Sequence, residues 1–454
     1  MLWSSSDLAL ATGTPLRVPF AASGISIDSR SLQPGDLFVA LTAARDGHEF
    51  VADALAKGAA GALIRRGALD LPKDAPVIEV GDPLAGLCDL AAFARARFQG
   101  RVVAVTGSVG KTSTKEMLRI ALGSQGRVHI AVASFNNHIG VPLTLARMPP
   151  EADYAVIEIG MNHPGEIAPL AALARPHVAL ITNIATAHVG EMGSVAAIAQ
   201  EKSAIFGGLM PEGAAVIPVG TAEYKILEQA AHQAGARLIR VGEGFDAELL
   251  SKALDHDGSD LFVRVLGQQI FLRLGAPGRH MAENAVMVLA AIAALGVDPA
   301  RAAPALAYFT AVAGRGVRRP ILGGKALLLD ESYNASTLSV RATLGLLDLH
   351  HAQRRIAVLG DMREMGEFGP SEHASLAEDV VAHADLLFTC GPLMGHLHDA
   401  VPASVAAMHA EDAERLAPLV AGAIRPGDVV LVKGSYGSNM RLVVDALTAL
   451  PEAV

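Results

Sequence analysis

The sequence predicts an α/β protein of three domains, because strand-like and helix-like patterns alternate along most of its 454 residues. That length suits about three domains of roughly 150 residues each. A hydrophobic content of 51% with 18% charged residues excludes a disordered chain or a coiled coil. We expect a small α/β domain at residues 1–82, a central parallel-sheet domain at 83–316 and a Rossmann-like α/β domain at 317–454.

The central domain is predicted from the segment RVVAVTGSVGKTST, residues 101–114. Val102 to Val105 form the apolar, β-branched run of a buried parallel strand, and Lys115 to Leu122 have the apolar spacing of a helix. Glycines between the two let backbone N–H groups face an anion, and the helix N-terminus adds partial positive charge. The segment therefore predicts a phosphate-binding loop of the short form GxxGK[ST].

Two side chains of this loop have predicted roles. Lys111 should contact the β- and γ-phosphates of a nucleoside triphosphate, and the Thr112 hydroxyl should bind Mg²⁺. An ordinary strand–helix turn that needs two glycines is the alternative, but the lysine and the paired hydroxyls favour the nucleotide. The expected nucleotide contacts in the loop are Gly107, Ser108, Val109, Gly110, Lys111, Thr112 and Ser113.

Composition limits the possible partners. The longest apolar run, Ala285 to Val297, is shorter than the roughly 20 residues of a membrane span, and we expect a buried helix there. A net charge of −9 argues against non-specific nucleic-acid binding. Only Cys88 and Cys390 are present, so neither a disulfide framework nor a CxxC metal site is expected, and Met1 to Gly13 does not resemble a signal peptide. We expect a cytoplasmic monomer without a membrane span.

The first 82 residues alternate short strands and helices. Strands are expected around Ile25 to Arg30 and Pro34 to Leu41, and a helix from Glu49 to Lys57. A longer helix should start at Asp82 and run to Phe98. Polar loop residues in this region would carry no function by themselves, since most such side chains are simply solvated.

The central sheet should continue through three further strands, at residues 154–159, 178–184 and 214–218. In open parallel sheets, ligands bind at the carboxyl ends of the strands. Glu158 lies at the end of one strand and His188 just past the end of another. Alone, each is more often a cap or a surface group, but together with Thr112 they converge on one phosphate-bound metal.

The remaining sequence predicts a hairpin and a third α/β unit. The hairpin joins residues 262–266 to 269–273 through Gly267, and Arg315 follows on a flexible Gly-Arg-Gly turn. Strands of the third unit are expected at 326–330, 356–359, 386–389 and 429–432. Their ends form a second crevice, and the absence of a GxGxxG motif argues against a dinucleotide there.

Short motifs with a fixed order are spread over nearly the whole chain. They are TGSVGKTST (106–114), SFNNHIGVPLTL (134–145), EIGMNHPGEI (158–167), TNIATAHVGEMGS (182–194), GRG (314–316), DESYNAS (330–336) and VLGDMREMGE (358–367). Together these motifs resemble those of the Mur ligases. DSR (28–30), PGDLFVAL (34–41) and DGH (46–48) fall where that family has a uridine-nucleotide domain. A DNPR-type motif of a sister ligase is absent, and the last domain has DESYNA and LGDMREMG segments instead.

The resemblance implies roles for residues that patterns alone leave unassigned. Glu158 and His188 would bind a second Mg²⁺, supported by a carbamylated Lys202, and Arg315 would contact the γ-phosphate. Asn284 would lie on the adenine side and Glu331 on the ribose. The implied substrate contacts are Ser29, Arg30, Asp46 and His48 for the uridine nucleotide, Asn136 and Asn137 for the phosphate or acyl phosphate, and Tyr333 and Asn334 for the dipeptide.

The resemblance also implies an activity. The expected reaction is the ATP- and Mg²⁺-dependent joining of D-alanyl-D-alanine to UDP-N-acetylmuramoyl-tripeptide through an acyl phosphate, for peptidoglycan synthesis. A folylpolyglutamate-type ligase and a nucleotide-dependent regulatory ATPase are the alternatives. Three segments depart from the family pattern and affect the expected adenine and dipeptide contacts, namely 217–220 (IPVG), 278–281 (GRHM) and 333–337 (YNAST).

Overall fold

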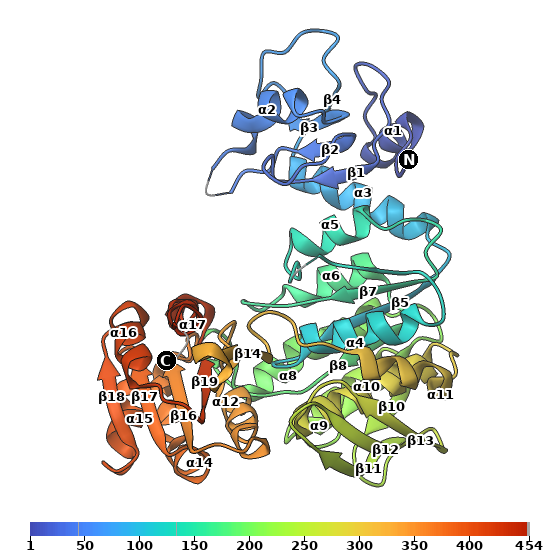
Figure 1. Cartoon of the computed structure of the whole chain (residues 1–454). Helices are drawn as coiled ribbons and strands as arrows, with labels where there is room; N and C mark the ends of the chain where they lie inside the picture. Colours follow the sequence, from blue (N-terminus) through green and yellow to red (C-terminus); the bar gives the residue numbers. More distant parts are fainter. Residues whose placement is uncertain (44, 133, 452–454) are drawn as a thin grey trace.

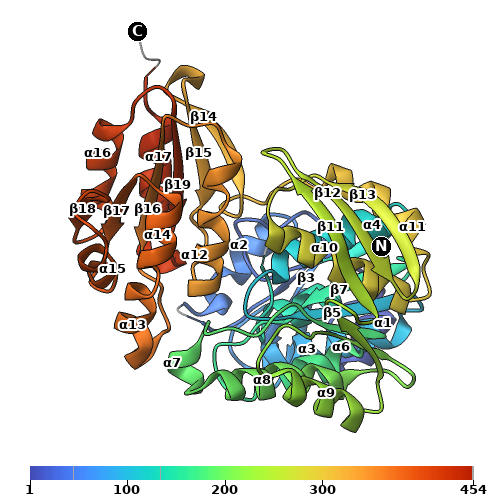
Figure 2. The same ribbon diagram turned by 90° about the horizontal axis from the view of Figure 1, so that it is seen from below.

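The structure is a computed structural model that describes residues 1–43, 45–132 and 134–451. The described chain forms a four-stranded, a nine-stranded and a six-stranded sheet, each with helices packed against it. The four-stranded sheet lies at one end of the central unit, and the six-stranded unit lies to one side of it (Figures 1 and 2). This arrangement confirms the predicted α/β class, whereas the boundaries near residues 82 and 316 stay predictions that fall between the sheets.

The four-stranded sheet is parallel throughout, in the order β1-β2-β3-β4. The indole N–H of Trp3 donates to the Ala146 carbonyl (3.0 Å), and the Arg147 guanidinium donates to the Ile25 carbonyl (2.6 Å). These bonds fix the first unit to the central one. Its elements are α1 Ser5–Thr12, β1 Gly24–Ser26, β2 Asp36–Val39, η1 Gly47–Phe50, α2 Val51–Ala56, β3 Gly61–Arg65, β4 Val77–Val80 and α3 Pro83–Arg97.

The nine-stranded sheet has the order β13-β12-β11-β10-β9-β8-β5-β7-β6. Strands β5 to β10 are parallel to one another, and β11 to β13 form an antiparallel meander at one edge of the sheet. The strands are β5 Arg101–Thr106, β6 Val128–Ile130, β7 Tyr154–Glu158, β8 Val178–Ile181, β9 Ala214–Pro218, β10 Arg237–Val241, β11 Ala247–Leu254, β12 Ser259–Val265 and β13 Gln268–Leu274.

Strand β5 lies between β7 and β8, and the chain order reverses there, which marks the crevice where ligands bind in open α/β sheets. The predicted hairpin is confirmed, with Leu266 and Gly267 both at positive φ in its turn. The helices of this unit are α4 Lys111–Gly123, α5 Gly140–Ala146, α6 Ile167–Ala174, α7 Val189–Met192, α8 Val195–Ser203, η2 Ala204–Gly208, α9 Tyr224–Gln233, α10 Arg279–Ala294, α11 Pro299–Ala302 and η3 Ala303–Tyr308.

The six-stranded sheet has the order β14-β15-β19-β16-β17-β18, parallel except for the edge strand β14. Its strands are β14 Val317–Ile321, β15 Ala326–Glu331, β16 Arg354–Gly360, β17 Leu386–Cys390, β18 Ala406–Ala410 and β19 Asp428–Lys433. Its helices are η4 Leu322–Gly324, α12 Thr337–Leu344, η5 Leu347–Leu349, η6 Gly366–Phe368, α13 Gly369–Ala374, α14 Ala377–His383, α15 Met394–Ala400, α16 Ala413–Ala423, η7 Tyr436–Ser438 and α17 Arg441–Thr448.

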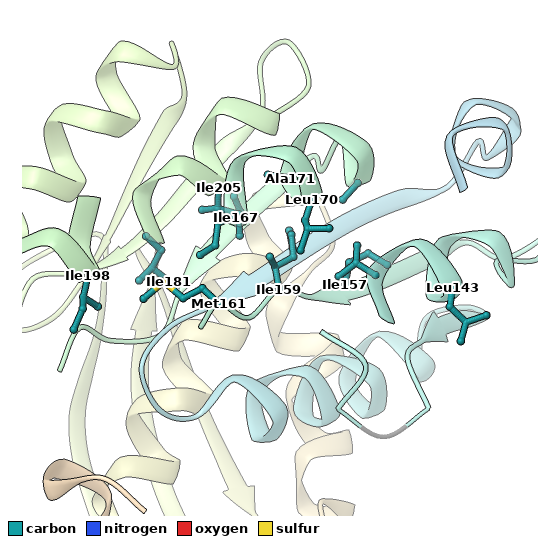
Figure 3. Close-up of a cluster of buried hydrophobic side chains, with 14 of the residues drawn as sticks. Leu143, Ile157, Ile159, Met161, Ile167, Leu170, Ala171, Ile181, Ile198 and Ile205 are labelled. Atoms are coloured by element: carbon teal, nitrogen blue, oxygen red, sulfur yellow. The ribbon is translucent and has the colours of Figure 1, made fainter. Parts of the chain in front are cut away.

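A buried apolar layer supports the strand ends of the central sheet. Ile157 of β7, Ile181 of β8, Ile167 of α6 and Ile205 of η2 belong to one cluster of buried hydrophobic side chains (Figure 3). Burial of this kind contributes about 1.5–3 kcal/mol per side chain. The loops that follow β5, β7 and β8 therefore start from a rigid base. No helix in the described ranges is long and apolar enough to cross a membrane.

Candidate active site

A cleft of about 1350 Å³ lies between the central unit and the six-stranded unit. It is lined by loops that follow β5, β7, β8 and β15, so strand ends from two sheets face each other across it. The predicted site residues that line it are Ser108, Val109, Gly110, Lys111, Thr112, Ser113, Asn136, Asn137, Glu158, His188, Asn284, Arg315, Glu331, Tyr333 and Asn334.

The phosphate-binding loop connects β5 directly to α4, as predicted. Gly107 and Gly110 have φ of 148° and 85°, and a Cβ at Gly107 would lie 1.9 Å from the Thr182 hydroxyl. Gly110 packs in the same way against the Asn284 amide, 3.0 Å from the position of a Cβ. Only glycine fits both positions, because the backbone is left-handed at Gly110 and neighbouring side chains are already close.

Asn183, which the sequence did not predict as a site residue, holds this loop through two hydrogen bonds. The Asn183 side-chain oxygen accepts from the Val109 N–H (2.9 Å), and its carbonyl accepts from the Ser108 N–H (3.1 Å). These two amides are therefore used within the protein. The first turn of α4 keeps its own N–H groups without intrahelical acceptors, so the donors for an anion are those of residues 110–113. Asn183 lies in the motif at 182–194, which was its only signal.

Lys111 folds back over the loop, and its Nζ donates to the Gly107 carbonyl (2.6 Å). Burial is the main cause that lowers the pKa of Lys111, while the Glu158 carboxylate nearby opposes the shift. An anion in the loop would offer this amine a stronger partner than a neutral carbonyl, because hydrogen bonds between charged groups are about twice as strong. The residue is therefore placed to move onto a bound phosphate.

A carboxylate lies directly beside the loop. Glu158, at the end of β7, is buried, and its Oε1 accepts from the Thr112 hydroxyl (3.2 Å) and the Asn136 amide (2.8 Å). Its Oε2 is also buried and has no hydrogen-bond partner among the described residues. A buried carboxylate oxygen without a donor is costly, and a cation would satisfy it. Thr112 and Glu158 thus fit the oxygen ligands that Mg²⁺ prefers.

Lys202 on α8 is fully buried, and its Nζ makes no hydrogen bond to any residue that the structure describes. Burial lowers the pKa of this amine well below its usual value, and the Lys111 charge lowers it further. This shift favours the neutral amine, which is the form that acts as a nucleophile. Among the described residues no three His, Cys, Asp or Glu side chains are grouped so that they could hold a metal ion.

His188 precedes α7 in a left-handed backbone conformation, with φ of 67°. Its Nδ1 lies 2.6 Å from a Glu364 carboxylate oxygen of the six-stranded unit. The Gly190 N–H donates to the Glu364 carbonyl (3.0 Å), and Gly190 lies close to Gly366. The strand-end loops of the two units are therefore docked onto each other beside the phosphate-binding loop. Glu364 was not predicted as a site residue.

Arg315 and Glu331 face the loop from the other side of the cleft. The Arg315 guanidinium lies over the Tyr333 ring, 4.2 Å from its centre. Glu331 is buried 3.7 Å from Lys433 Nζ, which donates to the Asn334 carbonyl (2.9 Å). Burial raises the pKa of Glu331 and lowers the pKa of Lys433. The turn at 314–316 thus holds an arginine against an aromatic ring and does not leave it in solvent.

Asn137 has a local structural contact as well as a place in the cleft. Its side-chain oxygen accepts from the Gly140 N–H (2.9 Å) and the Ile139 N–H (3.2 Å), which starts α5. Its amide nitrogen is the part that remains for a ligand.

The residues predicted for the uridine nucleotide do not line this cleft, because they belong to the first unit. Arg30 is exposed and pairs with Asp28 (2.6 Å). His48 is buried: its Nδ1 contacts Asp46 (2.6 Å), and its Nε2 accepts from the Arg65 N–H (2.9 Å). Both ring nitrogens of His48 are therefore occupied by the protein, so it supports the loop, whereas Arg30 is available to a ligand.

The loop, the buried Glu158 carboxylate and Arg315 across the cleft define the class of protein: a nucleotide-binding enzyme whose reaction takes place between two domains. Residues 105–293 match the family model of the Mur ligase middle domain, and residues 320–436 match that of the Mur ligase glutamate ligase domain. The chain belongs to the Mur ligase family and, within it, to the MurF branch.

Curated relatives match the chain from end to end, and they carry the same name, UDP-N-acetylmuramoyl-tripeptide--D-alanyl-D-alanine ligase. The relative from Rickettsia prowazekii is 30% identical over 98% of this chain and 99% of its own. The relative from Escherichia coli is 36% identical over 93% of both chains.

Solved structures agree with this assignment. MurF from Acinetobacter baumannii superposes with a TM-score of 0.88 at 29% identity, covering 98% of both chains. MurF from Thermotoga maritima, in complex with ADP, superposes with a TM-score of 0.80 at 26% identity over 94% of this chain and 97% of that one. A folylpolyglutamate synthase from Mycobacterium tuberculosis shares the fold alone, with a TM-score of 0.64 at 18% identity over 81% of this chain and 94% of that one.

Proposed function

We propose that the protein joins D-alanyl-D-alanine to UDP-N-acetylmuramoyl-tripeptide, using ATP, and so makes the UDP-linked pentapeptide for peptidoglycan synthesis. The observation that carries this proposal is the end-to-end similarity to relatives named for that reaction. The cleft supports it, because a phosphate-binding loop faces the strand ends of a second domain. ATP is the expected nucleotide, and the ADP complex of the Thermotoga maritima ligase supports it.

The chemistry requires activation, because a carboxylate is a poor electrophile. The tripeptide carboxylate attacks the γ-phosphorus of ATP and releases ADP, which gives an acyl phosphate; the amine of D-alanyl-D-alanine then attacks the acyl carbon and releases phosphate. Lys111 and Arg315 face each other across the cleft and stabilise the charge on the transferring group. Asn136 and Asn137 line the path of the acyl phosphate.

Thr112 and Glu158 are the residues that would hold Mg²⁺ at the phosphates, and His188 would take part in a second site. Bound there, Mg²⁺ would neutralise phosphate charge. Lys202 supports the second site if its amine has added to CO₂ and lost a proton, which gives a carbamate. Burial lowers the pKa of this amine and so favours the neutral form, which is the reactive form for that addition.

The proposal divides the remaining work among the domains. Residues 1–82 bind the uridine nucleotide, residues 83–316 bind ATP, and residues 317–454 bind ATP and D-alanyl-D-alanine. Ser29, Arg30 and Asp46 are kept as uridine-nucleotide contacts, with His48 holding Asp46 in place. We also propose a cytoplasmic monomer. Both cysteines are free thiols, which suits a reducing compartment.

A coupled assay tests the function against its two alternatives. Purified protein is given ATP and D-alanyl-D-alanine with UDP-tripeptides ending in meso-diaminopimelate or in lysine, and ADP release is followed. The ligase forms ADP only when both peptide substrates are present, whereas a regulatory ATPase turns over without them and a folylpolyglutamate-type ligase needs a folate and glutamate. The Lys111→Ala variant is the inactive control. The same rate of ADP release with and without the peptide substrates would contradict the proposal.

A further inference from the structure

A second, smaller cavity of about 280 Å³ adjoins the main cleft. The smaller cavity opens beside the phosphate-binding loop, because the two cavities share the wall residues Ala187, His188, Asn334, Ala335, Glu364 and Tyr436. The residues that line only the smaller cavity are Arg363, Ser435 and Gly437, from the loops that follow β16 and β19. Its volume lies below the range of about 300–1,000 Å³ for drug-sized ligands, which suits a compact molecule.

Arg363 brings an unpaired charge to this cavity. Among the residues that the structure describes, none forms an ion pair or a hydrogen bond with its guanidinium. The guanidinium lies flat against Gly437, where a Cβ would be 2.6 Å from Nη1 and 2.8 Å from Cζ. Glycine at 437 thus keeps open the space that the guanidinium occupies. A planar group of five N–H donors at a cavity wall is suited to a carboxylate.

The backbone under Arg363 is held in place by the neighbouring loops. The Arg363 N–H donates to the Ser435 hydroxyl (2.8 Å), and the Ser435 N–H donates to the Asp361 carbonyl (3.1 Å). The Asp361 carboxylate in turn accepts from the N–H groups of Leu393 and Met394 (3.1 and 2.8 Å) at the start of α15. Three strand-end loops are therefore tied together, and they fix the backbone from which the exposed Arg363 side chain extends.

Two alanines and one carboxylate also line the cavity. Ala187 and Ala335 are too short to fill the space themselves, so short aliphatic side chains fit against them. The Glu364 carboxylate lies 2.6 Å from His188 Nδ1 and would attract a positively charged group on that side. A ligand that fits this lining has a carboxylate at one end for Arg363, methyl-sized side chains, and an amine at the other end that reaches the His188 side and the main cleft.

We propose that this cavity binds the incoming D-alanyl-D-alanine, with Arg363 holding the dipeptide carboxylate and the dipeptide amine pointing into the main cleft. The inference rests on the proposed function and adds the location and the carboxylate contact of the second substrate. With the carboxylate on Arg363, the amine lies on the His188 side, where the acyl phosphate forms. Arg363 is thus a binding residue for the nucleophile and takes no part in phosphoryl transfer.

The test uses Arg363→Gln in the full-length protein and varies each substrate in turn. We expect KM for D-alanyl-D-alanine to rise about 10- to 100-fold, because the variant loses a charge-assisted hydrogen bond to the dipeptide. KM for ATP and KM for the UDP-tripeptide should stay nearly unchanged. D-alanyl-D-alaninamide, which lacks the carboxylate, is the second probe. Wild type should discriminate strongly against the amide, and Arg363→Gln should discriminate little. A rise in KM for the UDP-tripeptide instead would assign Arg363 to the other carboxylate and overturn the inference.

Two further variants complete the design. Gly437→Ala places a methyl group where the guanidinium lies and displaces it without removing the charge, so it should raise the dipeptide KM as well. Arg441→Gln removes an exposed arginine of α17 outside both cavities and should change no constant. If the wild-type protein joins the dipeptide while Arg363→Gln and Gly437→Ala keep both the wild-type KM for the dipeptide and the preference for the dipeptide over its amide, the inference about Arg363 is wrong. In that case the proposed function still stands. If wild type joins no dipeptide, the proposed function fails.

Discussion

His188 Nδ1 and a Glu364 carboxylate oxygen lie 2.6 Å apart, although one belongs to the central unit and the other to the six-stranded unit. His188 faces the cleft from a left-handed backbone position, and Glu364 also has a positive φ of 67°. Both residues thus hold strained conformations that the contact between the units supports. The contact makes the orientation of the imidazole depend on how the third unit is docked.

Glu364→Gln should therefore lower kcat by about 10- to 100-fold, the usual cost of removing a group that orients a metal-binding histidine. The side chain keeps its size, so thermal unfolding should stay at the wild-type temperature. Steady-state kinetics with all three substrates saturating provide the measurement. Glu367→Gln, an exposed neighbour outside both cavities, is the matched control. Wild-type kcat in Glu364→Gln would show that the contact does not orient His188.

Gly190→Ala should separate the central unit from the six-stranded unit at the contact beside His188 and Glu364. A Cβ at Gly190 would lie 2.4 Å from the Gly366 backbone nitrogen, and backbone atoms cannot move aside as a flexible side chain does. We expect a more open arrangement with lower kcat and a larger radius of gyration in small-angle scattering with substrates bound. Gly207→Ala is the control, because Gly207 has open space around it and no positive φ. Gly193 is less suitable, because its positive φ would strain an alanine. Unchanged kcat and scattering in Gly190→Ala would refute the docking role.

Lys202→Met should abolish ligation and leave the metal-free protein at least as stable as wild type. Methionine replaces a buried amine that has no partner among the described residues, and leaving such a group unsatisfied costs about 1–3 kcal/mol. Urea denaturation in chelator measures stability, and the ADP assay measures activity. Lys202→Ala should regain part of its activity with short-chain carboxylates, which replace the carbamate. Full activity of either variant would show that Lys202 has only a packing role.

Stability should fall as the pH drops from about 6.5 to 4, and His177 is one cause. Burial lowers the pKa of His177 to about 4, with Arg95 and Arg101 nearby adding to the shift, and its Nδ1 accepts from the Val102 N–H (2.9 Å) at the start of β5. Across that window the unfolded chain binds a proton that the folded chain does not, so unfolding becomes easier. Half-buried His280, whose pKa burial also lowers to about 4, acts in the same direction.

His177→Asn separates this contribution from the rest. Its side-chain oxygen can accept the same N–H bond and does not titrate, so its urea midpoint should change less between pH 7 and pH 5 than that of wild type. His232→Asn, on the partly exposed end of α9, is the control. Equal pH dependence in His177→Asn and wild type would exclude His177 as a cause.

The sequence predicted the elements whose pattern is local. The strand before the phosphate-binding loop, the helix after it and the 262–273 hairpin carry their own periodicity and turn residues. Both edge strands of the six-stranded sheet were missed for a physical reason. β14 contains Arg318, Arg319 and Pro320, a polar run that only an edge strand tolerates, and β18 is a short alanine-rich segment. Neither has the apolar signal of a central strand.

The candidate site was predictable where a side chain with a metal-binding oxygen lies at or just after the end of a predicted strand, as Thr112 and Glu158 do. It was not predictable where tertiary contacts decide. Asn183 braces the loop, and Glu364 reaches His188 from another unit; in both cases the partners are far apart in sequence. For His48 a motif match predicted a ligand contact, and the structure adds that both ring nitrogens contact protein groups. The ligand contact itself stays a prediction.

Arg30 and His48 therefore differ in what their removal should do. The Arg30 side chain is exposed and bonded only to Asp28 among the described residues, so Arg30→Ala should leave the fold intact. If residues 1–82 hold the uridine nucleotide, KM for the UDP-tripeptide should rise about tenfold or more, with kcat and KM for ATP nearly unchanged, because binding groups used equally in ground and transition states act on KM alone. Arg66→Ala, an exposed arginine after β3, is the control. An unchanged KM for the UDP-tripeptide, or a large rise in KM for ATP, would remove the uridine-nucleotide role from Arg30.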